Sequence, residues 1–189
     1  IYLNGTLWLT ENHAKGLSSS PTVFTLGAND TADGTWYKGW IDEFKIYNYA
    51  RTQKQIVEDM NAGHPVGGSP VSSKLLHFKL DEGYGTTQYD SSGYNNHGSF
   101  GGDPQWTFAG KKGKAVIFDG NGDYVDIGSI LISETNPTFS ITVWAYAESI
   151  DKYDGLISQY TSGANGRFYI GTINFGDFGY RIGGSSKSG

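Results

Sequence analysis

A loop rich in carboxylate and amide oxygens is the first candidate for metal chemistry. The stretch 90–96, Asp-Ser-Ser-Gly-Tyr-Asn-Asn, offers hard oxygen ligands, of which Ca²⁺ takes roughly six to eight, and its spacing is not that of an EF-hand. Asp90 and Asn95 are the candidate ligands, and the alternative is that both side chains form Asx turns. A second acidic stretch, 119–123, favours a tight hairpin over an ion site because its Gly and Asn residues supply turn geometry directly.

The acidic residues are not spaced for general acid–base catalysis. Glycosidases need two carboxyl groups held close together. Asp42 and Glu43 are adjacent in a predicted strand, so we expect them on opposite faces, and Asp123 and Asp126 do not share a face either. The four histidines lie far apart, and no serine-hydrolase or zinc-protease motif occurs. The sequence therefore predicts a protein that is not an enzyme.

Aromatic residues in predicted loops are candidates for sugar contact, because aromatic faces stack on the C–H surfaces of sugars. The candidate ligand-binding residues are Trp36, Tyr37, Tyr84, Tyr94, Tyr153 and Tyr160. The alternative is that aromatics fill a core or cover its edges, which we expect for Trp144, Phe118 and Trp40.

Two sequons are candidate N-glycosylation sites, at Asn4 and at Asn29. They matter only if the source organism glycosylates its surface proteins. Asn4 also lies in a predicted tight turn, Asn4-Gly5.

Strands must position nearly all of these residues. With 28 Gly, 13 Tyr and 17% charged residues, the composition favours strands joined by tight turns. Residues 50–61 instead predict a short helix, and residues 81–102 predict a long loop. The apolar period slips near Asp42 and Glu43, which predicts a β-bulge there. Many short strands indicate an all-β, antiparallel sandwich. Strand patterns cover 1–9, 22–27, 40–47, 75–80, 115–118, 123–127, 139–147, 155–160, 167–170 and 180–183.

The chain divides into two parts. Residues 63–73 are rich in Gly, Pro and Ser and predict a linker between 1–62 and 74–189. The net charge of −5 without a basic stripe argues against nucleic-acid binding, and no apolar run is long enough for a membrane span. The absence of cysteine excludes disulfides and thiolate metal sites.

Residues 74–189 resemble the opening half of a laminin-G-like domain, a jelly roll of the concanavalin A-like lectin/glucanase superfamily. The order and spacing of several short motifs carry this resemblance. The motifs are Leu80-Asp81-Glu82-Gly83, Asp90-Ser91-Ser92-Gly93, Asn95-Asn96-His97-Gly98, Gly113-Lys114-Ala115, Phe118-Asp119-Gly120, Asp123-Tyr124-Val125 and Phe139-Ser140-Ile141 through Trp144.

Residues 1–62 resemble the closing half of the same domain, so the halves stand in reversed order. Tyr2-Leu3-Asn4-Gly5 is similar to a late hairpin, and Ile41-Asp42-Glu43-Phe44-Lys45-Ile46-Tyr47 to the last strand. Three explanations are open: a tandem array, a circular permutation, or subunits that complete one another. Because half a sandwich exposes strand edges and core, we expect each half to find its complement within the chain or in another chain.

The resemblance implies a function and a location. It implies a non-catalytic, extracellular or cell-surface carbohydrate-binding or adhesion module of a larger tandem-repeat protein, with a glycan or neighbouring copies as partners. It also implies a structural calcium at a sandwich rim, where Asp42 and Glu43 would lie near Asp90. The alternatives are a structural subunit of a surface filament or array, a homopolymer assembled by strand complementation, and a fragment of a glycoside hydrolase or lyase.

Overall fold

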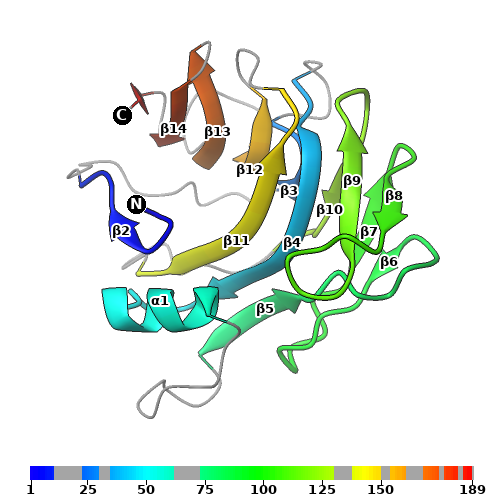
Figure 1. The fold of residues 1–189 in the computed structure, drawn as a ribbon, viewed down its shortest axis with the longest axis horizontal. Helices are drawn as coiled ribbons and strands as arrows, with labels where there is room; N and C mark the ends of the chain where they lie inside the picture. The colour runs from blue at the N-terminus through cyan, green and yellow to red at the C-terminus, as the bar shows by residue number, and fades with distance from the viewer. Residues whose placement is uncertain are drawn as a thin grey trace.

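The described residues form two large antiparallel β-sheets, a separate two-stranded hairpin and one short helix, as predicted for an all-β, concanavalin A-like jelly-roll sandwich (Figure 1). The computed structural model describes residues 1–10, 23–29, 35–61, 73–129, 138–149, 154–160, 168–174, 177–182 and 185–188. For residues 160, 173, 174, 177, 178, 181, 182 and 185–188 the description covers the backbone alone. Tyr153 and nearly all of the predicted linker lie outside the described residues.

The larger sheet has eight strands in the order β15-β14-β13-β12-β3-β10-β7-β6. Its strands are β3 (Val23–Leu26), β6 (Thr87–Gln88), β7 (Gly98–Gly101), β10 (Tyr124–Asp126), β12 (Gly155–Tyr160), β13 (Phe168–Asn174), β14 (Asp177–Ile182) and β15 (Ser185–Ser188). Strands β6 and β7 correct one prediction, since both lie in the stretch 81–102 that was expected to be a loop.

The smaller sheet has the order β11-β4-β9-β8, and β5 also pairs with β4. Its strands are β4 (Lys38–Tyr47), β5 (Lys74–Phe78), β8 (Gln105–Thr107), β9 (Ala115–Asp119) and β11 (Ser140–Ala147). The long strand β4 pairs with β11 along one edge, and with β9 and then β5 along the other. It is therefore the central strand of this sheet.

Strands from the first 61 residues lie inside both sheets. Strand β3 lies between β12 and β10, and β4 lies between β11 and the pair β9 and β5. In this structure the two parts of the chain thus pair with each other within one molecule.

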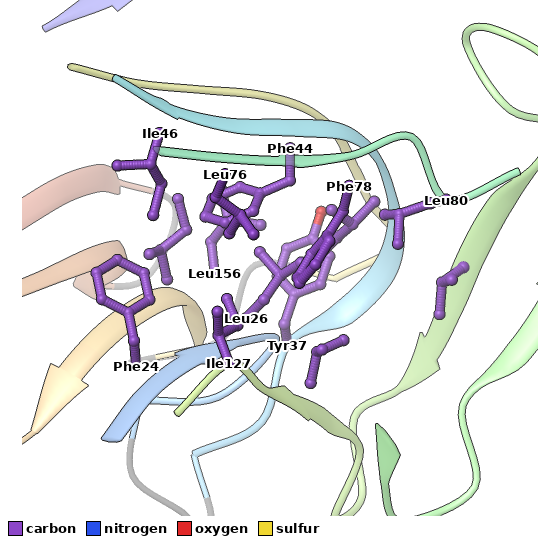
Figure 2. Packing of buried hydrophobic residues seen from close by; sticks show 14 of the residues in the cluster. Phe24, Leu26, Tyr37, Phe44, Ile46, Leu76, Phe78, Leu80, Ile127 and Leu156 are labelled. Carbon is purple, nitrogen blue, oxygen red and sulfur yellow. The ribbon is translucent and has the colours of Figure 1, made fainter. Parts of the chain in front are cut away.

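Side chains from both parts meet in the core between the sheets (Figure 2). Phe44 of β4 lies at the centre, with its ring centroid 6.5 Å from that of Phe24 and 6.3 Å from that of Phe78. All three rings are fully buried, and burial of each contributes roughly 1.5–3 kcal/mol. The core thus joins β3, β4 and β5.

The predicted bulge lies in β4. Glu43 has a φ of +50°, and the register shifts so that Thr142 opposes Lys45 while Trp144 opposes Asp42. One residue of β11 therefore faces two residues of β4, which is the pattern of a β-bulge. The prediction of a bulge at this point is confirmed.

A hairpin and the helix α1 (Gln53–Met60) pack together. The hairpin joins β1 (Tyr2–Leu3) to β2 (Thr6–Leu7), and Asn4 and Gly5 both have positive φ, as the predicted turn requires. Thr52 begins the helix through a capping box with Gln55. No helix in the described part of the chain has the length and apolar character needed to cross a membrane.

Candidate functional site

A strip of side chains crosses the outer face of the smaller sheet. Tyr146 of β11 lies opposite Trp40 of β4, Trp40 opposite Ile117 of β9, and Ile117 opposite Gln105 of β8. Residues directly opposite one another share a face of the sheet. Ile41, the neighbour of Trp40, points into the core, so Trp40 and its cross-strand partners point outward. With strands spaced about 4.8 Å apart, this strip spans roughly 14 Å. We call these four residues the outer strip.

The exposed end of the outer strip is aromatic. Tyr146 is 63% exposed, and its ring centroid lies 5.6 Å from that of Trp40. Trp40 is half-buried, and its indole Nε1 is buried without a hydrogen-bond partner. The end near β11 therefore presents a ring face to solvent and an unpaired donor beneath it.

Trp144 extends this aromatic surface by one row. It lies two residues before Tyr146 in β11, opposite Asp42, and the Lys111 ammonium lies 4.4 Å from its ring centroid. Trp144 was expected to fill the core or to cover its edges, and because it is only half-buried on the outer face, it does not fill the core. The reason is the strand period, because Ile141 and Val143 of β11 take the core-facing positions instead.

Asp42 and Glu43 both lie on this outer face, contrary to the prediction that they point to opposite faces. Both carboxyl groups contact Lys112: its backbone N–H donates to Asp42 Oδ2 at 2.8 Å, and its Nζ lies 3.8 Å from Glu43 Oε1. The physical reason is the bulge, which turns the backbone of Glu43 and breaks the alternation of faces. Asp42 is 3% exposed and Glu43 is 4% exposed.

The two carboxyl groups have opposite pKa shifts. Burial, with the nearby charge of Glu43, raises the pKa of Asp42 to about 6. Burial alone would also raise the pKa of Glu43, but hydrogen bonds from His77 and Lys45 lower it to about 2. Burial lowers the pKa of His77, so its neutral ring donates from Nε2 to Glu43 at 3.2 Å. Between about pH 2 and pH 6, a carboxylic acid at Asp42 therefore coexists with a carboxylate at Glu43 on this face.

The predicted calcium loop is closed by its own hydrogen bonds. Asp90 Oδ1 accepts from the backbone N–H groups of His77 and Ser92, and Oδ2 accepts from the Ser92 hydroxyl and the Asn96 N–H. Asn95 has a φ of +59°, as in a turn. Asp90 accepts from the backbone N–H of His77, whereas Glu43 contacts the ring of the same residue. This arrangement is the Asx-turn alternative, and the calcium assignment to Asp90, Asn95, Asp42 and Glu43 stays a prediction.

A different acidic cluster brings three carboxylates close enough to share one cation. The carboxylate oxygens of Asp103, Asp119 and Asp123 all lie within 4.8 Å of one another. Asp123 is buried, and its two oxygens accept the backbone N–H groups of Asp103 and Asp119. Burial, together with the charges of these two neighbours, raises the pKa of Asp123. Sequence reasoning weighed residues 119–123 as a turn and missed Asp103, which the fold alone brings close.

The predicted aromatic residues lie in different environments. Tyr37 is corrected to a core residue, because it is 2% exposed and its ring packs edge-on against Phe118. Trp36 is half-buried and stacks on Tyr124, at 6.0 Å between ring centroids. Tyr84 and Tyr94 are exposed, so their sugar contact stays a prediction. Tyr153 lies outside the described residues, as does the side chain of Tyr160.

The two predicted glycosylation sites differ in access. Asn4 is exposed at the tip of the hairpin, whereas Asn29 is 6% exposed. Asn29 therefore could not be modified in the folded state without local opening.

The sequence analysis missed the outer strip because it assigned Trp40 and Trp144 to the core or to its edges. The available signal was their alternation with apolar neighbours, since Ile41 and Phe44 in β4, and Ile141 and Val143 in β11, already account for the core-facing positions. An aromatic residue out of phase with the core residues of its strand is a surface residue.

One comparison with known proteins gives a match. Residues 1–57 match the laminin G model described as the Concanavalin A-like lectin/glucanases superfamily. No curated protein and no solved structure matches the chain. The matched segment contains β3 and β4, the central strands of both sheets, and the sandwich built around them is the architecture which that superfamily name denotes.

Proposed function

We propose that this chain is a non-catalytic carbohydrate-binding or adhesion module of an extracellular or cell-surface protein, and that the outer strip holds the sugar. The observation that carries this proposal is the in-register row of Tyr146, Trp40 and Ile117 on an open sheet face. Apolar C–H faces of sugar rings pack on such rows. The superfamily match over residues 1–57 supports the same class of ligand.

The polar groups beside the outer strip suit a hydroxyl-rich ligand. The Trp40 indole N–H donor and the Asp42 Oδ1 acceptor are both buried without partners. Leaving such groups unpaired costs roughly 1–3 kcal/mol each, and a sugar hydroxyl, which can both donate and accept, would reach them only after the side chains that cover them move. The Lys111 ammonium over Trp144 adds a charged donor at the same rim.

Hydrolysis is the second candidate, because the bulge places Asp42 and Glu43 on one face. The contacts of these groups favour a structural role instead: Glu43 forms a 2.8 Å ion pair with Lys45 and accepts from His77, and Asp42 Oδ2 accepts from Lys112. A general acid or nucleophile needs its oxygens free to reach the sugar. Release of reducing ends from a bound oligosaccharide, lost in Asp42→Asn, would establish the hydrolytic alternative.

We further propose that a structural calcium binds at Asp103, Asp119 and Asp123. Three carboxylates within 4.8 Å supply the hard oxygen ligands that Ca²⁺ prefers. A cation there would relieve the mutual repulsion that helps to raise the pKa of Asp123. The ion would hold the β9–β10 turn against the loop after β7.

The order of the two parts is also a proposal. We infer that 1–62 is the closing portion and 74–189 the opening portion of a laminin-G-like sandwich, in a protein that carries such modules in tandem. The pairing of β4 with β5, β9 and β11 supports completion within one chain.

A screen of immobilised oligosaccharides tests the proposed function. The wild-type chain should bind at least one glycan saturably, and Tyr146→Ala should lose most of that binding. Tyr84→Ala is the matched control, because Tyr84 is also an exposed tyrosine, at 79%, but lies in the loop after β5. Binding that is lost in Tyr84→Ala and retained in Tyr146→Ala would move the site to the loops.

A further inference from the structure

The ring of His77 lies between a carboxylate and an amine. Its Nε2 lies 3.2 Å from Glu43 Oε2, and its Nδ1 lies 3.3 Å from the Nζ of Lys74, at the start of the same strand β5. Because the neutral ring donates from Nε2 to Glu43, its Nδ1 carries a lone pair and accepts from Lys74. A carboxylate, an imidazole and an amine thus form one chain of hydrogen bonds, which is the arrangement that activates nucleophilic side chains. We call these three residues the amine relay.

The acidic groups around Lys74 already have other cations as partners. Glu43 forms a 2.8 Å ion pair with Lys45, and Asp59 forms a 2.8 Å ion pair with Arg51. Among the described residues, no ion pair joins Lys74 to a carboxylate. The hydrogen-bond acceptor of its Nζ is instead the uncharged Nδ1 of a histidine, which stabilises an ammonium less than a carboxylate does.

These surroundings favour the uncharged form of the Lys74 amine. Its side chain is half-buried, and this burial lowers its pKa more than any neighbouring charge does. The charges of Lys45 and Arg51 lower the pKa further, whereas those of Asp59 and Glu43 act in the opposite direction. Lys74 therefore has a larger uncharged fraction at neutral pH than an ordinary exposed lysine, and the uncharged amine is the nucleophilic form.

We propose that Lys74 is a nucleophilic amine that captures a small, uncharged aldehyde as an imine, with His77 as the positioning residue for its Nζ. An aldehyde is the fitting class because a lysine amine needs only a carbonyl carbon to form an imine, whereas acyl transfer needs an activated donor. The aldehyde is small because Lys74 is half-buried, and uncharged because the neighbouring charges are already paired. The capture is stoichiometric, so it goes beyond sugar binding without making the chain an enzyme.

Each bond and proton of the capture can be assigned. The Nζ lone pair adds to the carbonyl carbon, and the π electrons of the carbonyl move to its oxygen. His77 Nδ1 takes one proton from Nζ and passes it to that oxygen, which becomes a hydroxyl group. The hydroxyl group leaves as water with the second proton of Nζ, and the C=N bond forms. One amine and one aldehyde thus give one imine and one water, with no change of oxidation state.

The amine relay is separate from the outer strip. Lys74 pairs with Tyr47 at the end of β4, whereas Trp40 lies near the beginning of that strand. The imine proposal therefore does not depend on sugar binding. Loss of aldehyde capture with intact glycan binding, or the reverse, distinguishes the failure of one proposal from that of the other.

Reductive trapping on the full chain tests the proposal. The probe is glycolaldehyde, a small uncharged aldehyde, with cyanoborohydride added to reduce the imine to a stable amine. Mass spectrometry of the peptides then measures the adduct on each lysine. At pH 7 the initial rate at Lys74 should exceed that at Lys54, an exposed lysine of α1, at least about fivefold. The rate at Lys74 should also reach half of its maximum at a lower pH than the rate at Lys54.

Two histidine variants test the positioning role of His77. His77→Gln should lower the trapping rate at Lys74 about tenfold and leave the rate at Lys54 unchanged. His97→Gln is the matched control, because the ring of His97 lies against Tyr89 instead, and it should keep the wild-type rate at Lys74. A rate at Lys74 no higher than at Lys54, the same pH midpoint for both lysines, or an unchanged rate in His77→Gln would each overturn the proposal. The first two comparisons use the wild-type chain alone, so they decide the matter even where His77→Gln does not fold.

Discussion

The ring of Tyr146 in β11 lies beside the indole of Trp40 in β4, with 5.6 Å between ring centroids. The two residues are direct cross-strand partners, so the backbone register of the sheet holds the two rings together. Sheet register, in place of loop conformation, therefore positions the aromatic surface to which we assign sugar binding.

Removing the exposed ring should weaken sugar binding without unfolding the protein. Tyr146→Ala should lower the affinity for the best oligosaccharide about tenfold, equal to about 1.4 kcal/mol. Its melting temperature should change little, because Tyr146 is mostly exposed. Calorimetric titration of both proteins measures the affinity, and equal affinities would exclude Tyr146 as a sugar contact.

The buried Asp42 should make stability fall as the pH rises. Its pKa is 3.8 when exposed and about 6 in the folded protein, so between these values the folded state holds the extra proton. Stability therefore declines from about pH 4 to pH 6, and Asp42→Asn should remove this decline. At pH 7 the variant should be more stable by roughly 1–3 kcal/mol, and at pH 3 equal to wild type.

Glu43 makes stability rise with pH, because its pKa in the folded protein, about 2, lies below the value of 4.5 for an exposed glutamate. Its stabilisation is fully present above pH 4.5 and is lost as the pH falls toward 2. Urea unfolding from pH 2 to pH 7 measures both slopes. An Asp42→Asn variant less stable than wild type at pH 7 would show that the Asp42 carboxylate is net stabilising.

Truncating Asp90 should destabilise the protein whether or not calcium is present. The carboxylate accepts four hydrogen bonds from His77, Ser92 and Asn96, and Asp90→Ala leaves these donors unpaired. We expect a loss of roughly 2–4 kcal/mol in the free energy of unfolding. A loss seen only in the presence of calcium would instead support the predicted ion site in this loop.

Calcium should stabilise the chain through its acidic cluster. Saturating calcium at about 100 times its Kd adds roughly 2.7 kcal/mol to the free energy of unfolding, and chelation removes it. Asp119→Asn should abolish this shift, while Asp126→Asn, an aspartate of the neighbouring strand outside the cluster, should keep it. Thermal unfolding with and without EDTA provides the measurement, and an unchanged melting temperature in the wild type would refute a structural calcium.

Replacing Phe44 tests whether the two parts of the chain unfold together. Its ring contacts Phe24 from the first part and Phe78 from the second, so Phe44→Ala should cost roughly 3–5 kcal/mol. Leu7→Ala, at a residue 51% exposed in the hairpin, is the control with little expected effect. Calorimetry should show one transition for each protein, and two separate transitions in the wild type would contradict a shared core.

Local signals predicted the longer strands and the hairpin, but they missed the short strands β6, β7 and β8 and could not give the strand partners. Asn4-Gly5 predicted its hairpin and the apolar period predicted β4 with its bulge, because both depend on neighbouring residues. The shared face of Asp42 and Glu43 was missed because the strict alternation of strand faces was applied across the predicted bulge, which reverses that alternation. The closeness of Asp103 to Asp119 depends on strand order, which a single sequence does not encode locally.

The most direct test of the sugar-binding face uses the indole N–H signals of the five tryptophans. In a ¹H–¹⁵N titration with the oligosaccharide bound best in the screen, the Trp40 and Trp144 signals should shift. Those of Trp36 and Trp106, which pack against Tyr124 and Phe100 elsewhere in the sandwich, should stay in place. Shifts at Trp36 or Trp106 with none at Trp40 and Trp144 would contradict the assignment of the outer strip.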